Sequence, residues 1–102
     1  MIVSDPSSQL AGRWAMVTGA SRGIGREAAM ALGQIGCNLV LHSRSVEHTR
    51  ELDAAIRAMG VETLSVAADL AVPEQVDELV MAVSGHGISI DILYNNAGYM
   101  FP

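Results

Sequence analysis

The chain has 102 residues, half of them hydrophobic, and a formal net charge of −5. This length suits a single domain, and the apolar content is sufficient for a buried core. The acidic balance disfavours broad binding to nucleic acid or to an anionic membrane, although it allows a small basic pocket for one phosphorylated ligand. The single cysteine, Cys37, excludes an internal disulfide and an all-cysteine metal site.

Residues 1–12 are polar and small, and we expect them to form a mobile leader before a domain over 13–102. They lack the basic start and the long apolar run of a signal peptide or an anchor. No segment approaches the roughly 18–20 apolar residues that a membrane span needs. A soluble cytoplasmic protein is therefore expected.

Four strands are predicted from short apolar runs, over 14–17, 38–42, 62–68 and 90–94. Three helices are predicted between them, from apolar residues at helical spacing. The expected buried positions are Ile24, Ala28, Ala31, Leu32 and Ile35 in the first helix, Leu52, Ala55, Ile56 and Met59 in the second, and Val76, Leu79, Val80 and Val83 in the third.

Regular alternation of strands and helices is typical of parallel βαβ units with right-handed crossovers. We expect an α/β fold with a doubly wound parallel sheet of about four strands, in the order 3-2-1-4, and three helices. This order puts the topological switch between the first and fourth strands, where ligands bind beyond the carboxyl ends of the strands. The segments that follow these two strands should line one crevice.

The segment 18–25 reads T-G-A-S-R-G-I-G and joins the first strand to the first helix. Gly19 suits the tight exit from the strand, Gly23 a close approach of the backbone to a pyrophosphate, and Gly25 close packing of helix and strand. This turn predicts a dinucleotide site at a helix N-terminus. The alternative is a glycine-rich turn without a ligand. A phosphate loop of the kinase type is excluded, because the chain contains no lysine.

Together with Asp69-Leu70 after the third strand and N-N-A-G at 95–98, this turn resembles the classical short-chain dehydrogenase/reductase family. The resemblance covers about residues 10 to 100 and is closest to 3-oxoacyl-carrier-protein reductases and sugar-alcohol dehydrogenases. It implies a Rossmann fold, a nicotinamide cofactor and hydride transfer to or from a carbonyl or alcohol carbon. It also implies a homo-oligomer for a full-length protein, and it leaves the substrate open.

The resemblance also implies a set of cofactor-binding residues. Those around the phosphates would be Gly19, Ser21, Arg22, Gly23, Ile24 and Gly25. Asp69 would meet the adenine amino group, with Leu70 packing nearby, while Asn96, Ala97 and Gly98 would border the riboses and Asn95 would hold the fourth strand. The alternatives are a turn or helix-capping role for Asp69 and ordinary turn chemistry for the asparagines.

The end of the second strand predicts the choice of cofactor. An NAD enzyme normally offers a carboxylate there to the ribose 2′-hydroxyl, whereas this chain reads His42-Ser43-Arg44. Arg44, helped by Ser43 and Arg22, could form charge-assisted hydrogen bonds to a 2′-phosphate. The sequence therefore predicts NADP(H) in preference to NAD(H). The alternative is that Arg44 is a solvated loop cation.

In the family, protons are transferred by a serine and a Tyr-x-x-x-Lys pair. The only tyrosines are Tyr94 and Tyr99, and no lysine assists either of them. We therefore expect no catalytic residue in this chain and no turnover by it alone. The histidines lack the spacing of a metal site. The prediction is the cofactor-binding half of an oxidoreductase, with two alternatives: a non-catalytic nucleotide-binding module, or a half that pairs with a second chain.

Overall fold

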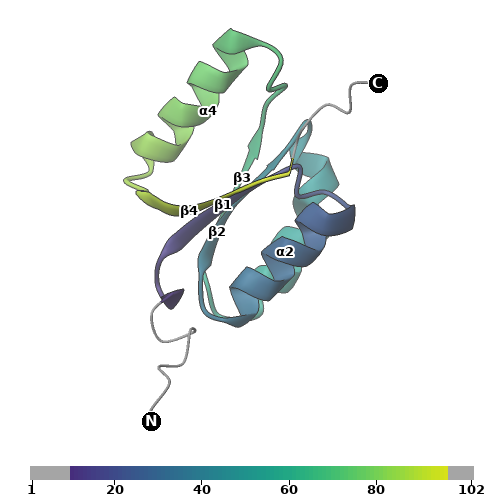
Figure 1. Cartoon of the computed structure of the whole chain (residues 1–102), viewed down its shortest axis with the longest axis vertical. Coiled ribbons are helices and arrows are strands. Elements are labelled where there is room, and N and C mark those ends of the chain that lie inside the picture. Colours follow the sequence, from purple (N-terminus) through teal and green to yellow (C-terminus); the bar gives the residue numbers. More distant parts are fainter. Residues whose placement is uncertain (1–9, 97–102) are drawn as a thin grey trace.

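The computed structural model of the chain describes residues 10–96 (Figure 1). Four strands and three α-helices alternate along this part, with a 3₁₀-helix, η1, before α3. The elements are β1 (Trp14–Thr18), α2 (Gly23–Gln34), β2 (Asn38–Ser43), η1 (Val46–Thr49), α3 (Arg50–Arg57), β3 (Thr63–Ala67), α4 (Pro73–Gly85) and β4 (Ile90–Asn95).

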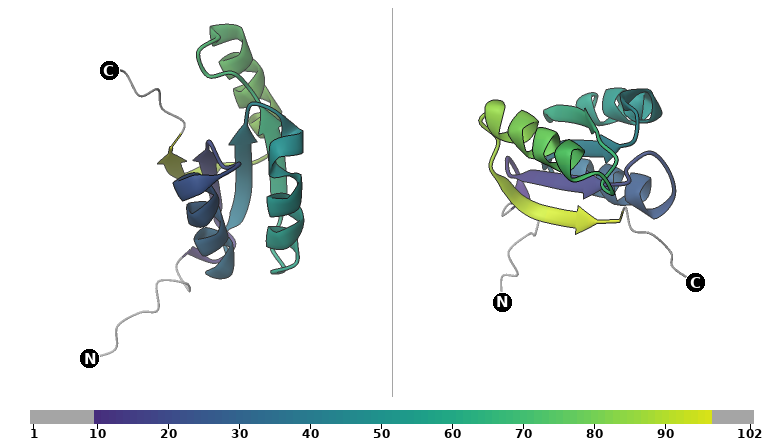
Figure 2. Two further views of the ribbon diagram at one scale, coloured as in Figure 1. Left: turned by 90° about the vertical axis from the view of Figure 1, so that its right-hand side faces the viewer. Right: turned by 90° about the horizontal axis from the view of Figure 1, so that it is seen from above.

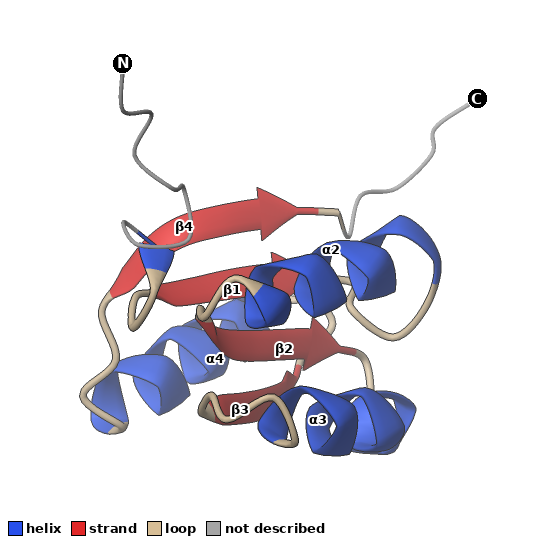
Figure 3. Ribbon diagram, turned by 90° about the horizontal axis from the view of Figure 1, so that it is seen from below, coloured by secondary structure: helices blue, strands red, loops and turns tan. Residues whose placement is uncertain are grey.

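The strands form one parallel sheet in the order β3-β2-β1-β4. Helices α2 and α3 lie on one face of this sheet, and α4 covers the other (Figure 3). The predicted fold class and strand order are confirmed. Because all strands run in one direction, their carboxyl ends meet at a single edge of the sheet.

The core consists of two apolar clusters, one on each face of the sheet. Leu39 and Leu41 of β2 pack on the side of α2 and α3, together with Ile56. Val40, which points the opposite way, packs on the side of α4 with Leu79. All three β2 side chains are fully buried, as expected for a central parallel strand covered on both faces.

The buried face of α2 agrees with the predicted one only in part, since Leu32 and Ile35 pack against the core as expected. Ile24 is 69% exposed and Ala31 is also exposed, whereas Gly25, Ala29 and Gly33 are buried. These three small residues follow one another at intervals of four, so they lie on one face of the helix. Large side chains on that face would hold the helix away from the sheet. The apolar pattern therefore missed the positions of closest approach, because it relies on large apolar residues and α2 approaches the sheet through small ones.

A similar difference affects α4. Leu79 and Val83 are buried as predicted, but Val80 is 56% exposed. Strand β4 borders the sheet (Figure 2) and has the register Ala15↔Ile92 with β1. Its Leu93 is 62% exposed, because α4 packs mainly over β2 and β3.

The described part of the chain begins with residues that contact the core. Leu10 packs against the cluster under α2, and the Gly12 amide donates to the Gly36 carbonyl at 2.9 Å. The Cys37 thiol donates to the Leu10 carbonyl at 3.5 Å, and burial raises the pKa of this thiol. The expected leader thus has its last residues, 10–12, in contact with the fold, while residues 1–9 lie outside the described part. None of the described helices is both long and apolar enough to span a membrane.

Candidate functional site

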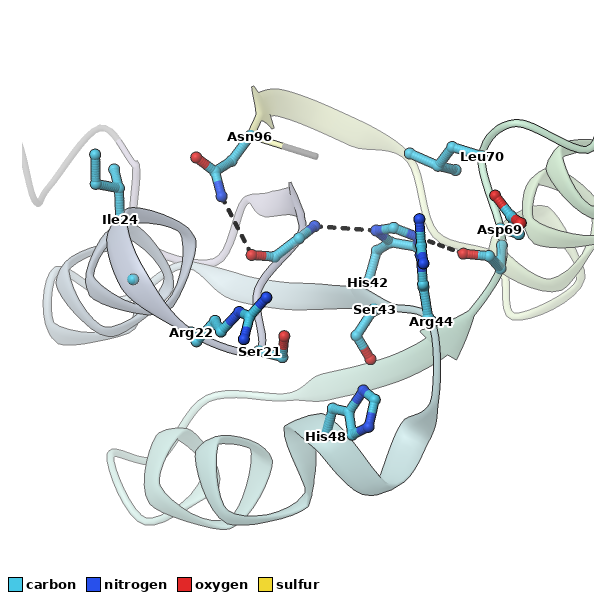
Figure 4. Close-up of a pocket in the computed structure, with 13 residues that line it drawn as sticks. Ser21, Arg22, Ile24, His42, Ser43, Arg44, His48, Asp69, Leu70 and Asn96 are labelled. Atoms are coloured by element: carbon cyan, nitrogen blue, oxygen red, sulfur yellow. Dashed lines mark hydrogen bonds between the residues drawn. The ribbon is translucent and has the colours of Figure 1, made fainter. Parts of the chain in front are cut away.

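A cavity of about 880 Å³ opens at the edge where the four strands end (Figure 4). This volume lies within the range of small-molecule and cofactor sites. Segments that follow or end every strand contribute to its walls. The lining residues are Gly19, Ser21, Arg22, Gly23, Ile24, His42, Ser43, Arg44, His48, Ala68, Asp69, Leu70 and Asn96. The glycine-rich turn and Asn96, which are far apart in the sequence, therefore lie in one crevice, as the topology predicted.

The glycine-rich turn has the backbone geometry of an anion cradle. Gly19 and Gly23 have φ values of +63° and +62°, a left-handed conformation that disfavours side chains. Arg22, at φ −161°, leads into α2 in an extended conformation. Among the described residues, no side chain caps the start of α2, and its first turn contains no acidic residue. The first amide groups of the helix thus carry a partial positive charge at the cavity.

Gly25 lies so close to the turn that a side chain does not fit. A Cβ atom at this position would be 2.2 Å from the Gly19 carbonyl oxygen and 2.7 Å from Nδ2 of Asn96. Helix α2, the turn and the segment after β4 therefore meet at one point. The shape of the cradle depends on this close approach.

Two hydrogen bonds at Thr18 join the end of β1 to the end of β4. The Thr18 hydroxyl donates to Oδ1 of Asn95 at 3.0 Å and accepts from the Asn96 amide at 2.9 Å. In addition, Nδ2 of Asn96 donates to the Gly19 carbonyl at 3.3 Å. These contacts hold two walls of the cavity together. Ala97 and Gly98, which were expected beside the riboses, lie outside the described residues.

His42 has a role that sequence reasoning missed. Its side chain is buried, Nδ1 accepts from the Gly19 amide at 3.0 Å, and Nε2 lies 2.9 Å from the Ala68 carbonyl. Since the amide only donates and the carbonyl only accepts, the neutral ring carries its proton on Nε2. One imidazole thus ties the glycine-rich turn to the end of β3. The only signal in the sequence was a polar residue inside an apolar strand.

Two arginines give the cavity its positive charge. Arg22 follows β1 and Arg44 follows β2, and both side chains are exposed at the cavity (Figure 4). In the described part of the chain neither of them forms an ion pair. By contrast, the Ser43 hydroxyl is buried and donates to the Ser45 carbonyl at 2.5 Å. It would have to leave this bond in order to donate to a phosphate.

Asp69 and Leu70 lie on the opposite wall, after β3. Oδ1 of Asp69 accepts from the Ala71 amide at 3.0 Å, and the Asp69 amide donates to Oε1 of Gln75 at 2.7 Å. The carboxylate thus stabilises the turn before α4, which was the alternative considered from the sequence. Leu70 packs against the core under α4 and also lines the cavity. Contact of either residue with adenine remains a prediction.

His48 also lines the cavity. Its side chain is exposed, and it belongs to η1, which directly precedes α3. Within residues 10–96, no group of three or more His, Cys, Asp or Glu side chains is arranged to hold a metal ion.

Comparison with known proteins gives consistent matches for almost the whole chain. A model of the short chain dehydrogenase family matches residues 13–102. A 3-oxoacyl-[acyl-carrier-protein] reductase of Staphylococcus epidermidis is 39% identical over 85 residues, which is 82% of this chain and 35% of that protein. The chain thus spans about a third of the length of this relative.

Solved structures with the same fold include complexes with either nicotinamide cofactor. L-sorbose reductase from Gluconobacter frateurii, complexed with NADPH and L-sorbose, is 38% identical with a TM-score of 0.82, and the match covers 88% of this chain and 35% of that one. An NAD⁺-bound xylitol dehydrogenase is 34% identical with a TM-score of 0.79, and the match covers 89% of this chain and 35% of that one.

Proposed function

This chain belongs to the short-chain dehydrogenase family, and from that premise we propose that it forms the NADP(H)-binding part of an oxidoreductase. When bound, the nicotinamide supplies or accepts the hydride that is exchanged with a carbonyl or alcohol carbon. The chain's own residues bind and orient the cofactor. Amide groups of the glycine-rich turn and of the first turn of α2 would hold the pyrophosphate, and Leu70 and Asp69, which line the cavity, would contact the adenine.

The observation that carries the preference for NADP(H) is Arg44 at the end of β2. A ribose 2′-hydroxyl is usually held by a carboxylate at this position, and a carboxylate would repel a 2′-phosphate. Here the guanidinium groups of Arg44 and Arg22 reach the same cavity, and neither is neutralised by an ion pair within the described residues. Solved structures with this fold are complexed with either cofactor, so the fold alone does not decide the choice, and the proposal assigns it to these two side chains.

The size of the preference follows from the chemistry of the contact. A hydrogen bond to a charged group contributes about 1.5–3 kcal/mol. Two such bonds to a 2′-phosphate would favour NADPH over NADH by at least about a hundredfold. Both arginines are exposed, and solvent screening makes the lower end of the range the better expectation.

The test is to measure dissociation constants of NADPH and NADH for the wild type and for the Arg44→Gln variant. We expect Arg44→Gln to bind NADPH at least about tenfold more weakly, with little change for NADH, because one charge-assisted contact is lost. Arg26→Gln is the matched control, since Arg26 is exposed on α2 and does not line the cavity. Equal affinities of the wild type for the two cofactors would end the proposed preference.

Substrate turnover requires a group that moves a proton to or from the substrate oxygen. In this family a lysine cation lowers the pKa of a tyrosine for this purpose. The 102 residues contain no lysine, so we propose that this chain alone binds the cofactor without turnover. Oxidation of NADPH by the purified chain with a simple carbonyl substrate, above the rate without protein, would refute this part of the proposal.

A further inference from the structure

We propose that His42 is a positioning residue that holds the glycine-rich turn in its cofactor-binding shape through a neutral imidazole, so that protonation of this ring weakens binding of both NADPH and NADH. The inference rests on the proposed function and adds that pH changes the affinity of the same site for the cofactor. It concerns a buried side chain that need not touch the cofactor.

His42 holds two successive residues of the turn. The ring accepts from the Gly19 amide at 3.0 Å, while the His42 carbonyl accepts from the Ala20 amide at 2.8 Å. The other ring nitrogen reaches the Ala68 carbonyl at 2.9 Å, so the ring cannot rotate without losing a partner. Gly19 has a positive φ and accepts from Asn96 through its carbonyl. A shift of Gly19 would therefore change both the cradle and the wall next to it.

The two hydrogen bonds of the His42 ring are compatible with only one protonation state of the imidazole. Nδ1 must be an acceptor for the Gly19 amide, and Nε2 must donate to the Ala68 carbonyl. A protonated imidazole carries a hydrogen on both nitrogens and offers no acceptor. The Gly19 amide would then face another donor in a site that is 2% exposed at His42, and a buried donor without a partner is costly.

Other charged and titratable side chains near the His42 ring determine which control variants the experiment needs. Arg22 from the glycine-rich turn, Arg44 from the end of β2, His48 from η1 and Asp69 from the end of β3 line the same cavity. Arginine and ordinary carboxylate side chains keep their charge between about pH 8 and pH 5, whereas imidazole side chains change theirs. His48 is thus the second histidine to consider. The 2′-phosphate of NADPH also takes up a proton, near about pH 6 for a phosphate monoester, and NADH lacks it.

The experiment measures dissociation constants of NADH and NADPH at about pH 8 and about pH 5, the range in which histidine titrates. The wild type should bind NADH more weakly at the lower pH, by a factor that grows with the protonated fraction of His42. Its limit is about fivefold to a hundredfold, which corresponds to complete loss of one contact with a buried donor. His42→Leu should bind both cofactors at least about fivefold more weakly at the higher pH, because every molecule of this variant lacks the contact with the Gly19 amide. Its NADH affinity should no longer depend on pH.

His42→Asn separates positioning from loss of the ring. The asparagine oxygen can accept from the Gly19 amide and does not titrate, so this variant should recover most of the NADH affinity and lose the dependence on pH. His48→Gln should retain the weakening of NADH binding in acid. His86→Gln is the matched control, because His86 is exposed at the end of α4 and does not line the cavity. It should behave like the wild type.

A second readout is independent of the cofactor. Long-range ¹H–¹⁵N spectra of the free chain at about pH 8, where a free imidazole is mainly neutral, should show His42 protonated at Nε2 and bare at Nδ1. Three results would overturn the inference and leave the proposed function intact. They are a proton on Nδ1, wild-type NADH affinity in His42→Leu, and wild-type pH dependence of NADH binding in His42→Asn. A wild-type chain that binds neither cofactor would overturn the proposed function and this inference with it.

Discussion

Replacing Gly25 with alanine tests whether the cofactor cradle depends on close contact between α2 and the glycine-rich turn. The new Cβ atom would be 2.2 Å from the Gly19 carbonyl oxygen, below the 3.0 Å that real Cβ contacts respect. The turn or the helix must therefore move by at least about 0.8 Å. Because the nearest atom belongs to the backbone, no side-chain rotation can relieve the contact.

The expected cost follows from this geometry. Inserting a methyl group into a packed site destabilises a protein by about 1–3 kcal/mol. Alanine normally stabilises a helix by about 1 kcal/mol relative to glycine, so a net loss would mean that the contact outweighs the propensity. The difference between these two values predicts a net loss of up to about 2 kcal/mol in the free energy of unfolding. NADPH affinity should also fall, because Gly19 and Asn96 both line the cavity.

Two other glycines that lie in helices provide controls for the Gly25→Ala substitution. A Cβ atom at Gly85 of α4 would meet nothing within 4 Å, so Gly85→Ala should be neutral or slightly stabilising. At Gly33 of α2 the nearest atoms would be Sδ of Met59 at 3.1 Å and Cγ2 of Ile56 at 3.2 Å, which are side-chain atoms and lie farther away than the backbone oxygen that Gly25→Ala would meet. Gly33→Ala should therefore cost much less than Gly25→Ala.

Unfolding in urea can be followed by the fluorescence of Trp14, the single tryptophan, which is half-buried at the start of β1. The free energy of unfolding and the NADPH dissociation constant would be measured for the wild type and the three alanine variants. If Gly25→Ala were as stable as Gly85→Ala and bound NADPH like the wild type, the close approach of Gly25 to the Gly19 carbonyl would contribute to neither stability nor binding, and the reasoning would be wrong.

Three further predictions follow from particular contacts. Thr18→Val removes the hydroxyl that joins β1 to the end of β4, and it should lower the free energy of unfolding by about 1–3 kcal/mol and weaken NADPH binding, whereas Thr18→Ser should restore both. Asp53→Ala removes the acceptor of hydrogen bonds from Thr63 (2.6 Å) and Ser65 (2.7 Å) and the ion-pair partner of Arg57 (2.8 Å). A loss of about 1–3 kcal/mol in the free energy of unfolding in urea is expected without a change in NADPH affinity, and unchanged stability would contradict this. The raised pKa of the buried Cys37 thiol lowers its thiolate fraction at a given pH, so iodoacetamide should label the native chain far more slowly than the chain in urea, and equal rates would refute the burial.

The sequence was sufficient to predict the order of elements, the parallel sheet and the place of the cavity. Apolar runs that alternate with helical patterns are compatible with few chain topologies. In the order 3-2-1-4, the turn at Gly19 and the segment at Asn96 follow neighbouring parallel strands and therefore lie at the same edge of the sheet. These properties depend on local patterns and on a general rule of chain handedness. They need no knowledge of individual side-chain contacts.

The contacts that shape the site were decided only by the tertiary structure. Ile24 is apolar yet exposed at the cavity, because α2 packs through Gly25, Ala29 and Gly33 instead. The partners of His42 are backbone groups more than 20 residues away in either direction, 23 residues for the Gly19 amide and 26 for the Ala68 carbonyl. Backbone amides and carbonyls are the same in every residue, so no sequence pattern can indicate which of them a buried imidazole will meet. Only the folded chain brings these groups together.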